Sequence, residues 1–362
     1  ISTSLSSSGW LAAATRSKVL LYCLKNMDPP RKVPLDTTIE VTSSKRERIR
    51  EIALSDDLLA ILTYSHLIVY EYREPGNIER HRVANEQLDQ AGAWTPKSLS
   101  ISQNRSVDEQ IARPDIWAWI AVGGQGENAV KIFKFIRDRR WNLQNRKLML
   151  KCASNTGSIN FVGFSTNRSS LPEASVIFGI TNSNEIHCWD LRKLSQRDLF
   201  STWQIDGCQK TNQSPNRGGI TSATIFLSQS GRPYIFCTAD QKAGSELSGS
   251  FIAPIGSRPP QRHILQESAI GRNVLHGSVA SNGIFSVVIE DEEMRLLTLR
   301  GVNGGLTCRK EYLRWPSKLK NAATGVSGLS ITILESHGKL NIVAVDCWRN
   351  ILSREINVPG LP

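Results

Sequence analysis

Clusters of basic side chains are the residues of this sequence whose type and spacing best suit a binding chemistry. The chain carries 44 Lys and Arg residues against 33 Asp and Glu residues, which gives a formal net charge of +11 at pH 7. Such an excess attracts polyanions and acidic partners over long range. We predict that the clusters form a basic surface able to engage phosphates or acidic peptides. They comprise Lys45, Arg46 and Arg48; Arg137, Arg139 and Arg140; Arg192 and Lys193; and Arg258 and Arg262.

Groups that could support catalysis or metal binding lack the spacing that such chemistry needs. No two of the six histidines lie at an HxH or HExxH spacing, the patterns that place imidazoles around a metal ion. The Gly-rich stretch 123–126 lacks the Lys-Ser/Thr of a phosphate-binding loop, and no Gly-x-Ser-x-Gly elbow occurs. The acidic run Glu290–Glu293 has the composition of a solvated hairpin tip. We therefore predict no enzymatic activity, no cofactor and no metal ion.

Short strands joined by polar turns must position the basic clusters. In the stretch 175–192, an apolar run is followed by a polar turn and then by an alternating run. Period-two alternation with β-branched and aromatic residues predicts an antiparallel pair. The same pattern predicts seven pairs, at 10–15 and 18–24, 58–63 and 66–72, 116–122 and 130–135, 176–180 and 185–191, 234–239 and 251–253, 284–289 and 294–299, and 340–345 and 351–352.

Additional strand-like segments flank most of these pairs. They precede a pair at 49–54, 97–101, 158–164, 220–227, 274–279 and 326–334, and they follow one at 38–42, 141–150, 201–205 and 309–314. The units therefore tend toward four strands and recur at a spacing of roughly 48 to 59 residues, somewhat longer than a tight WD repeat. The only helix-like segment is Ala84–Ala91.

The end of the fourth unit resembles the close of a WD repeat. Trp189-Asp190-Leu191-Arg192 reads aromatic, acidic, apolar, basic, and an aromatic residue stands in the corresponding place at Tyr22, Tyr70 and Phe133. The chain resembles a WD-repeat-like β-propeller over nearly all of its length. The resemblance implies an all-β fold, a seven-bladed β-propeller of four-stranded antiparallel blades. The alternative is six blades, with the fifth unit as an insertion.

The resemblance also implies where binding and catalytic residues would lie. Loops after the third strand of each blade emerge on one face, so that face is expected to be basic, while the cluster 45–48 lies between the first two blades. Acids of a glycosidase-type propeller would point inward from the first strands, where Glu51 is the exception to a general lack of carboxylates. We expect residues 1–362 to form one domain, a fragment of a larger protein.

The sequence thus favours a non-catalytic scaffold that binds other proteins or peptides, acidic ones included, within a larger intracellular protein or complex. The alternative is a nucleic-acid-engaging subunit of a chromatin, transcription or RNA-processing assembly, using the basic face. Seven scattered cysteines without a Cys-x-x-Cys pair favour a reducing compartment, the cytoplasm or the nucleus. No apolar stretch reaches the about 18 residues that a membrane-spanning helix needs.

Overall fold

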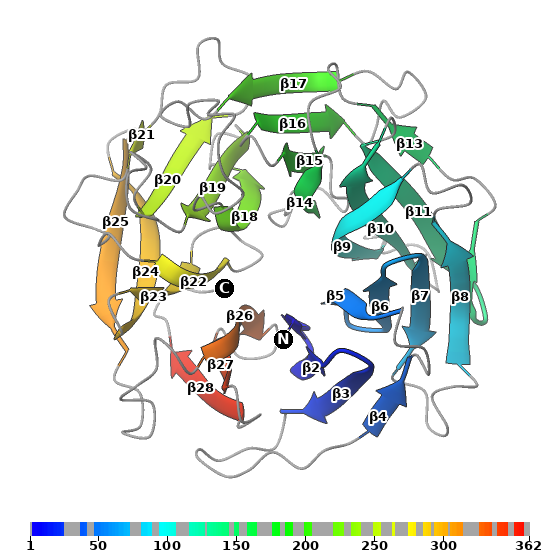
Figure 1. Cartoon of the computed structure of the whole chain (residues 1–362). Coiled ribbons are helices and arrows are strands. Elements are labelled where there is room, and N and C mark those ends of the chain that lie inside the picture. The colour runs from blue at the N-terminus through cyan, green and yellow to red at the C-terminus, as the bar shows by residue number, and fades with distance from the viewer. Residues whose placement is uncertain are drawn as a thin grey trace, which may run out of the picture. The chain divides into compact units, whose positions relative to one another are not determined.

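Antiparallel β-strands make up the regular structure of the chain (Figure 1). A computed structural model describes residues 2–24, 37–41, 47–72, 81–88, 94–105, 116–126, 129–144, 148–151, 158–164, 176–181, 185–190, 199–204, 220–227, 233–239, 249–254, 263–264, 274–279, 285–290, 293–302, 305–313, 326–334, 339–346 and 351–357. In these ranges no helix is long and apolar enough to cross a membrane.

The described strands form seven sheets, and five of them have the four strands that the sequence predicts. The chain divides into two compact units. The first unit, mainly residues 33–182 with 1–27 and 187–200, holds three sheets and most of a fourth. These sheets are β1 (Ser2–Leu5), β2 (Trp10–Ala14), β3 (Lys18–Cys23) and β4 (Thr37–Glu40); β5 (Ile49–Leu54), β6 (Leu58–Thr63), β7 (His66–Glu71) and β8 (Arg82–Gln87); β9 (Thr95–Arg105), β10 (Ile116–Gln125), β11 (Val130–Arg137), β12 (Trp141–Leu143) and β13 (Leu148–Leu150); and β14 (Ile159–Phe164), β15 (Val176–Thr181), β16 (Glu185–Asp190) and β17 (Leu199–Gln204).

The second unit, mainly residues 201–362, holds the other three sheets. Its last sheet has three strands among the described residues. The sheets are β18 (Ile220–Leu227), β19 (Pro233–Ala239), β20 (Gly249–Pro254) and β21 (His263–Ile264); β22 (Val274–Val279), β23 (Phe285–Glu290), β24 (Glu293–Val302) and β25 (Gly305–Tyr312); and β26 (Val326–Leu334), β27 (Lys339–Asp346) and β28 (Ile351–Asn357).

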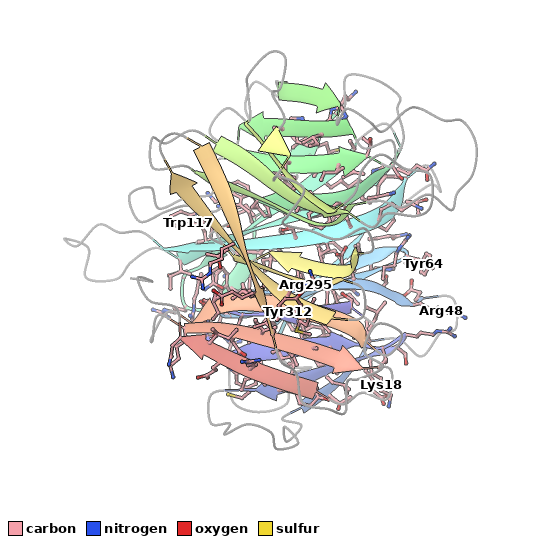
Figure 2. The ribbon with its side chains drawn as sticks, turned by 90° about the vertical axis from the view of Figure 1, so that its left-hand side faces the viewer. Lys18, Arg48, Tyr64, Trp117, Arg295 and Tyr312 are labelled. Carbon is pink, nitrogen blue, oxygen red and sulfur yellow. The ribbon has the colours of Figure 1, made fainter. Side chains whose placement is uncertain are left out.

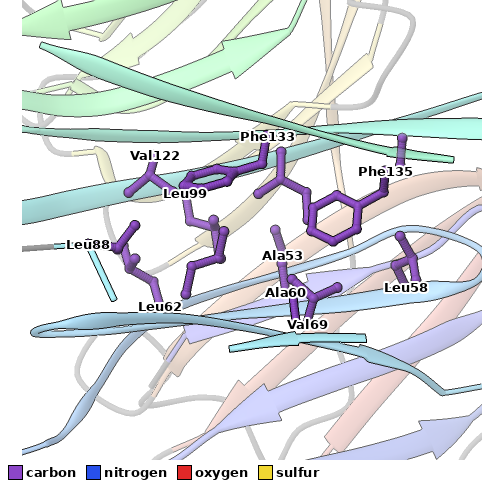
Figure 3. Close-up of a cluster of buried hydrophobic side chains, with 14 of the residues drawn as sticks. Ala53, Leu58, Ala60, Leu62, Val69, Leu88, Leu99, Val122, Phe133 and Phe135 are labelled. Atoms are coloured by element: carbon purple, nitrogen blue, oxygen red, sulfur yellow. The ribbon is translucent and has the colours of Figure 1, made fainter. Parts of the chain in front are cut away.

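The core of the first unit lies between neighbouring sheets. All six residues of β6 are buried. Its alternate side chains point in opposite directions, as the period-two geometry of a strand requires. Leu58, Ala60 and Leu62 pack with residues of the third sheet, Phe133 among them (Figure 3). Leu59 and Ile61 pack instead with residues of the first sheet. A strand covered on both faces needs a continuous apolar run, which explains the sequence Leu-Leu-Ala-Ile-Leu of 58–62.

The fifth strand of the third sheet is the second half of an interrupted outer strand. β12 pairs with residues 135–137 of β11, and β13 pairs with residues 130–132 of the same strand. Between them, the backbone N–H of Gln144 donates to the carbonyl of Lys134 at 2.9 Å. Both segments therefore follow one edge of β11, in agreement with the single strand predicted at 141–150.

A β-bulge recurs in the first strand of six sheets. In each case the register against the second strand shifts by one residue near the N-terminal end of the first strand. A bulge inserts one residue that has no ladder partner and redirects its side chain. The inserted residues are Arg50, Lys97 and Asn160 in the first unit, and Thr221, Leu275 and Ser327 in the second.

The only helix-like segment of the sequence, Ala84–Ala91, is not helical over the part that the structure describes. Residues 82–87 form β8, which pairs antiparallel with β7. Ala84 is buried in the core between the second and third sheets, while Arg82 and Asn85 are exposed. Hydrogen bonding to the edge of β7 therefore overrides the local helix preference of this segment.

Candidate interaction surface

Each sheet of the first unit presents turns at two ends of its strands. Because antiparallel strands alternate in direction, the turns between first and second strands and between third and fourth strands share one end. The turns between second and third strands share the other end with the connections to the next sheet. We call these the Asp57 end, after a residue in the β5–β6 turn, and the Tyr64 end, after a residue in the β6–β7 turn.

The basic residues predicted from the sequence do not all lie at one end. Lys45, Arg46, Arg192, Lys193, Arg258 and Arg262 fall outside the described residues. Arg137, Arg139 and Arg140 lie at the Asp57 end, at the turn from β11 to β12. Arg48 precedes β5, so it follows a fourth strand and lies at the Tyr64 end. Figure 2 shows Arg48 and Tyr64 on one side, with Trp117 of β10 on the other.

Arg137 belongs to a polar network between the second and third sheets. Its Nη1 lies 3.4 Å from Oδ2 of Asp57, and its Nη2 lies 3.7 Å from Oε1 of Glu71. Gln103 Nε2 also donates to Asp57 Oδ2 at 2.6 Å. Two largely buried carboxylates therefore compensate the guanidinium, and Arg137 joins the two sheets. Arg139 and Arg140 are exposed in the adjoining turn.

At the opposite end, an exposed tyrosine and an arginine form a stacked pair that the sequence reasoning missed. Tyr64 is 49% exposed in the β6–β7 turn. The guanidinium carbon of Arg50 lies 4.7 Å from the centre of its ring, a cation–π contact. Arg50 Nη1 also donates to the carbonyl of Pro96 in the third sheet at 2.6 Å. The apolar pattern gave no signal for this pair, because Arg50 is the inserted residue of a bulge.

Further cations lie at the same end of the strands as this pair. Arg16 and Arg48 are exposed, and the backbone N–H of Ile49 donates to the carbonyl of Arg16 at 2.8 Å. Lys97 follows Pro96 directly and is the bulge residue of the third sheet. The Tyr64 surface, as we use the term, consists of Arg16, Arg48, Arg50, Tyr64 and Lys97.

Ser65, His66 and Glu47 beside this surface have the residue types of a catalytic triad but not its geometry. Ser65 Oγ lies 2.7 Å from His66 Nδ1 and 2.5 Å from Glu47 Oε1. The same carboxylate oxygen lies 3.2 Å from the same Nδ1. In a triad the imidazole bridges nucleophile and acid with its two nitrogens, whereas here both partners meet one nitrogen. The cluster fixes the β4–β5 connection to the β6–β7 turn.

Glu51 lies on β5. We singled it out from the sequence as the exception to the lack of carboxylates in the first strands. The residue is half-buried, and its Oε2 accepts a hydrogen bond from the backbone N–H of Leu99 at 2.7 Å. Burial raises the pKa of Glu51 to about 8, against the opposing effects of this bond and of the Arg50 charge. The carboxyl is therefore mostly neutral at pH 7 and links the first strands of two sheets.

No group of three or more His, Cys, Asp or Glu able to hold a metal occurs among the described residues.

The fold is that of the WD-repeat-like β-propellers, and solved structures resemble the chain over most of its length. A chain in the crystal structure of the mitotic checkpoint complex is 10% identical, with a TM-score of 0.56, and the match covers 99% of this chain and 89% of that one. The Pan2 WD40 domain of Neurospora crassa is 10% identical with a TM-score of 0.57, over 97% and 87%. The periplasmic gluconolactonase of Pseudomonas aeruginosa is 13% identical with a TM-score of 0.51, over 86% and 84%.

At these identities the likeness shows the fold alone. No model of a known protein family and no curated protein matches the sequence. The neighbours include an enzyme as well as a member of a protein complex, so function must be argued from the site and not from the fold.

Proposed function

We propose that the chain is a non-catalytic protein–protein interaction module, a single seven-bladed β-propeller domain over residues 1–362 that acts in a larger complex of the cytoplasm or nucleus. Two features support seven blades. The described strands fall into seven sheets, one of which has an interrupted outer strand. The bulge in the first strand recurs in six of them.

One observation carries the proposed role: a Tyr–Arg pair exposed on rigid strands. Tyr64 is half-exposed and Arg50 is held against its ring and against the third sheet. Tyrosine and arginine are over-represented among the residues that dominate the affinity of protein interfaces. Holding them in place before binding reduces the entropy lost on association. A chain of the mitotic checkpoint complex has the same fold, which is consistent with a role in assembly.

Affinity purification from a native extract, with quantitative mass spectrometry, tests the proposal. We expect the wild-type chain to retain specific proteins in stoichiometric amounts. A matched purification with Tyr64→Ala/Arg48→Glu and one with Arg139→Glu/Arg140→Glu would assign partners to either end of the strands. Turnover of a lactone by the purified chain would contradict the non-catalytic role. Salt-dependent retention of random DNA or RNA, lost on Arg139→Glu/Arg140→Glu, would favour the nucleic-acid alternative instead.

A further inference from the structure

We propose that the Tyr64 surface binds a short acidic segment of a partner protein. The inference rests on the proposed function, because it names the kind of partner and the end of the strands that receives it. The site proposed for the acidic partner lies at the opposite end of the strands from the turns after the third strands. From the sequence, we expected most of the basic residues at those turns.

The first argument is unbalanced positive charge. Among the described residues, Arg16, Arg48 and Lys97 have no acidic partner within ion-pair distance. Three carboxylates lie at this end: Glu40 lies 2.5 Å from Lys18 Nζ, Glu47 contacts Ser65 and His66, and Glu86 lies on the outer strand β8. The end therefore has a net positive charge that an acidic ligand would neutralise.

Glu51 does not reduce the net positive charge of this end near neutral pH. Its carboxyl lies on β5 directly after Arg50, where a carboxylate would reduce the positive potential. Burial raises the pKa of Glu51 to about 8, so the group carries little charge at pH 7. The neutral carboxyl still accepts the N–H of Leu99, which keeps the first strands of the second and third sheets in place.

The second argument is that the cations are held in position by the fold. Bulges in two neighbouring sheets take Arg50 and Lys97 out of the ladder alternation. Arg50 is then fixed by the Tyr64 ring and the Pro96 carbonyl. Arg48 is placed by the bond from the next residue, Ile49, to the carbonyl of Arg16. A guanidinium whose geometry is fixed before binding can meet a carboxylate in the bidentate arrangement that makes such pairs strong.

The pattern of charge favours a peptide over a nucleic acid. Glu40 and Glu47 lie among the cations of this end, so the positive charge is not continuous. A phosphodiester chain places a negative charge at every nucleotide and favours an unbroken basic track. An acidic peptide has separate carboxylates and uncharged backbone between them, and that backbone can lie against the exposed face of Tyr64.

Fluorescence anisotropy with a labelled peptide of alternating Glu and Ser residues tests the inference on the full chain. The matched control peptide has Gln in place of Glu. We expect the Glu peptide to bind the wild type and the Gln peptide to bind at least about tenfold more weakly. Raising the salt from about 50 mM to about 300 mM should weaken Glu-peptide binding, because the Debye length shortens. Single-stranded DNA of matched length and phosphatidylserine vesicles are the competing probes.

Two variants decide whether binding occurs at this surface. Arg48→Glu/Lys97→Glu should reduce Glu-peptide affinity by at least about tenfold, while Arg139→Glu/Arg140→Glu, which changes the same charge at the other end, should reduce it far less. Equal losses in both variants, undetectable binding to the wild type, or tighter binding of DNA or vesicles than of the Glu peptide would overturn the inference. If extract proteins still bind the Arg48→Glu/Lys97→Glu variant, the scaffold role stands and only this assignment fails.

Discussion

Glu51 is expected to make the stability of the protein depend on pH in a direction opposite to that of most carboxylates. Burial raises its pKa from an ordinary 4.5 to about 8. Between these values the folded chain keeps a proton that the unfolded chain has lost. The stabilisation is therefore present in full below pH 4.5 and is lost as the pH rises through about 8. At about 1.4 kcal/mol per pH unit, the difference of about 3.5 corresponds to about 5 kcal/mol. This is an upper bound, since the residue is half-buried.

The substitution Glu51→Gln isolates this effect. Glutamine cannot ionise, and its side-chain carbonyl can still accept the N–H of Leu99. Urea unfolding followed by tryptophan fluorescence should show little change at about pH 5 and a stabilised variant, by up to about 5 kcal/mol, at about pH 9. Glu40→Gln is the control, because a hydrogen bond from Lys18 lowers the pKa of Glu40 and its loss should not stabilise at high pH. A Glu51→Gln chain less stable than wild type at about pH 9 would refute the reasoning.

Three further substitutions test the packing and the polar links between sheets. A Cβ on Gly163 would lie 2.4 Å from the Phe178 ring, so Gly163→Ala should lower the urea midpoint by the equivalent of about 1–3 kcal/mol. Arg137→Leu should destabilise by about 1–3 kcal/mol near pH 7, because the buried carboxylates of Asp57 and Glu71 lose their cation. Ser98→Ala removes a hydrogen bond of 3.1 Å to a carbonyl of the fourth sheet, and we expect a loss of about 1 kcal/mol in thermal unfolding.

Strands covered on both faces were predictable from the sequence because their apolar runs are long and dense. The expected pair 58–63 and 66–72 corresponds to β6 and β7. The segment 251–253, a poor strand by sequence, forms part of β20. Its pairing with β19 along six residues compensates for a weak local pattern. First strands were located as well, since β5, β18, β22 and β26 have the bounds that the sequence predicts.

Edge strands and charged sites were less predictable because their side chains are not selected for burial. β1 and β8 were not expected as strands, and neither has an apolar run. The stacking of Arg50 on Tyr64 depends on a bulge, and no periodicity reveals a bulge before the register of both strands is known. The charge of Arg137 is likewise compensated by Asp57 and Glu71, which are remote from it in sequence. Charge clustering in the sequence therefore identified basic residues without showing which of them are free to bind.

The polar side chains that interrupt several first strands have a physical reason in how neighbouring sheets are joined. A first strand pairs with the second strand on one edge, and its other edge has backbone groups that need partners. Side chains supply several of them: Ser4 Oγ accepts from the N–H of Leu54 at 2.9 Å, and Glu51 accepts from the third sheet. Ser98 donates to a carbonyl of the fourth sheet. Such positions require short polar side chains or a neutral carboxyl, so the alternation that identifies other strands is weakened where the sheets meet.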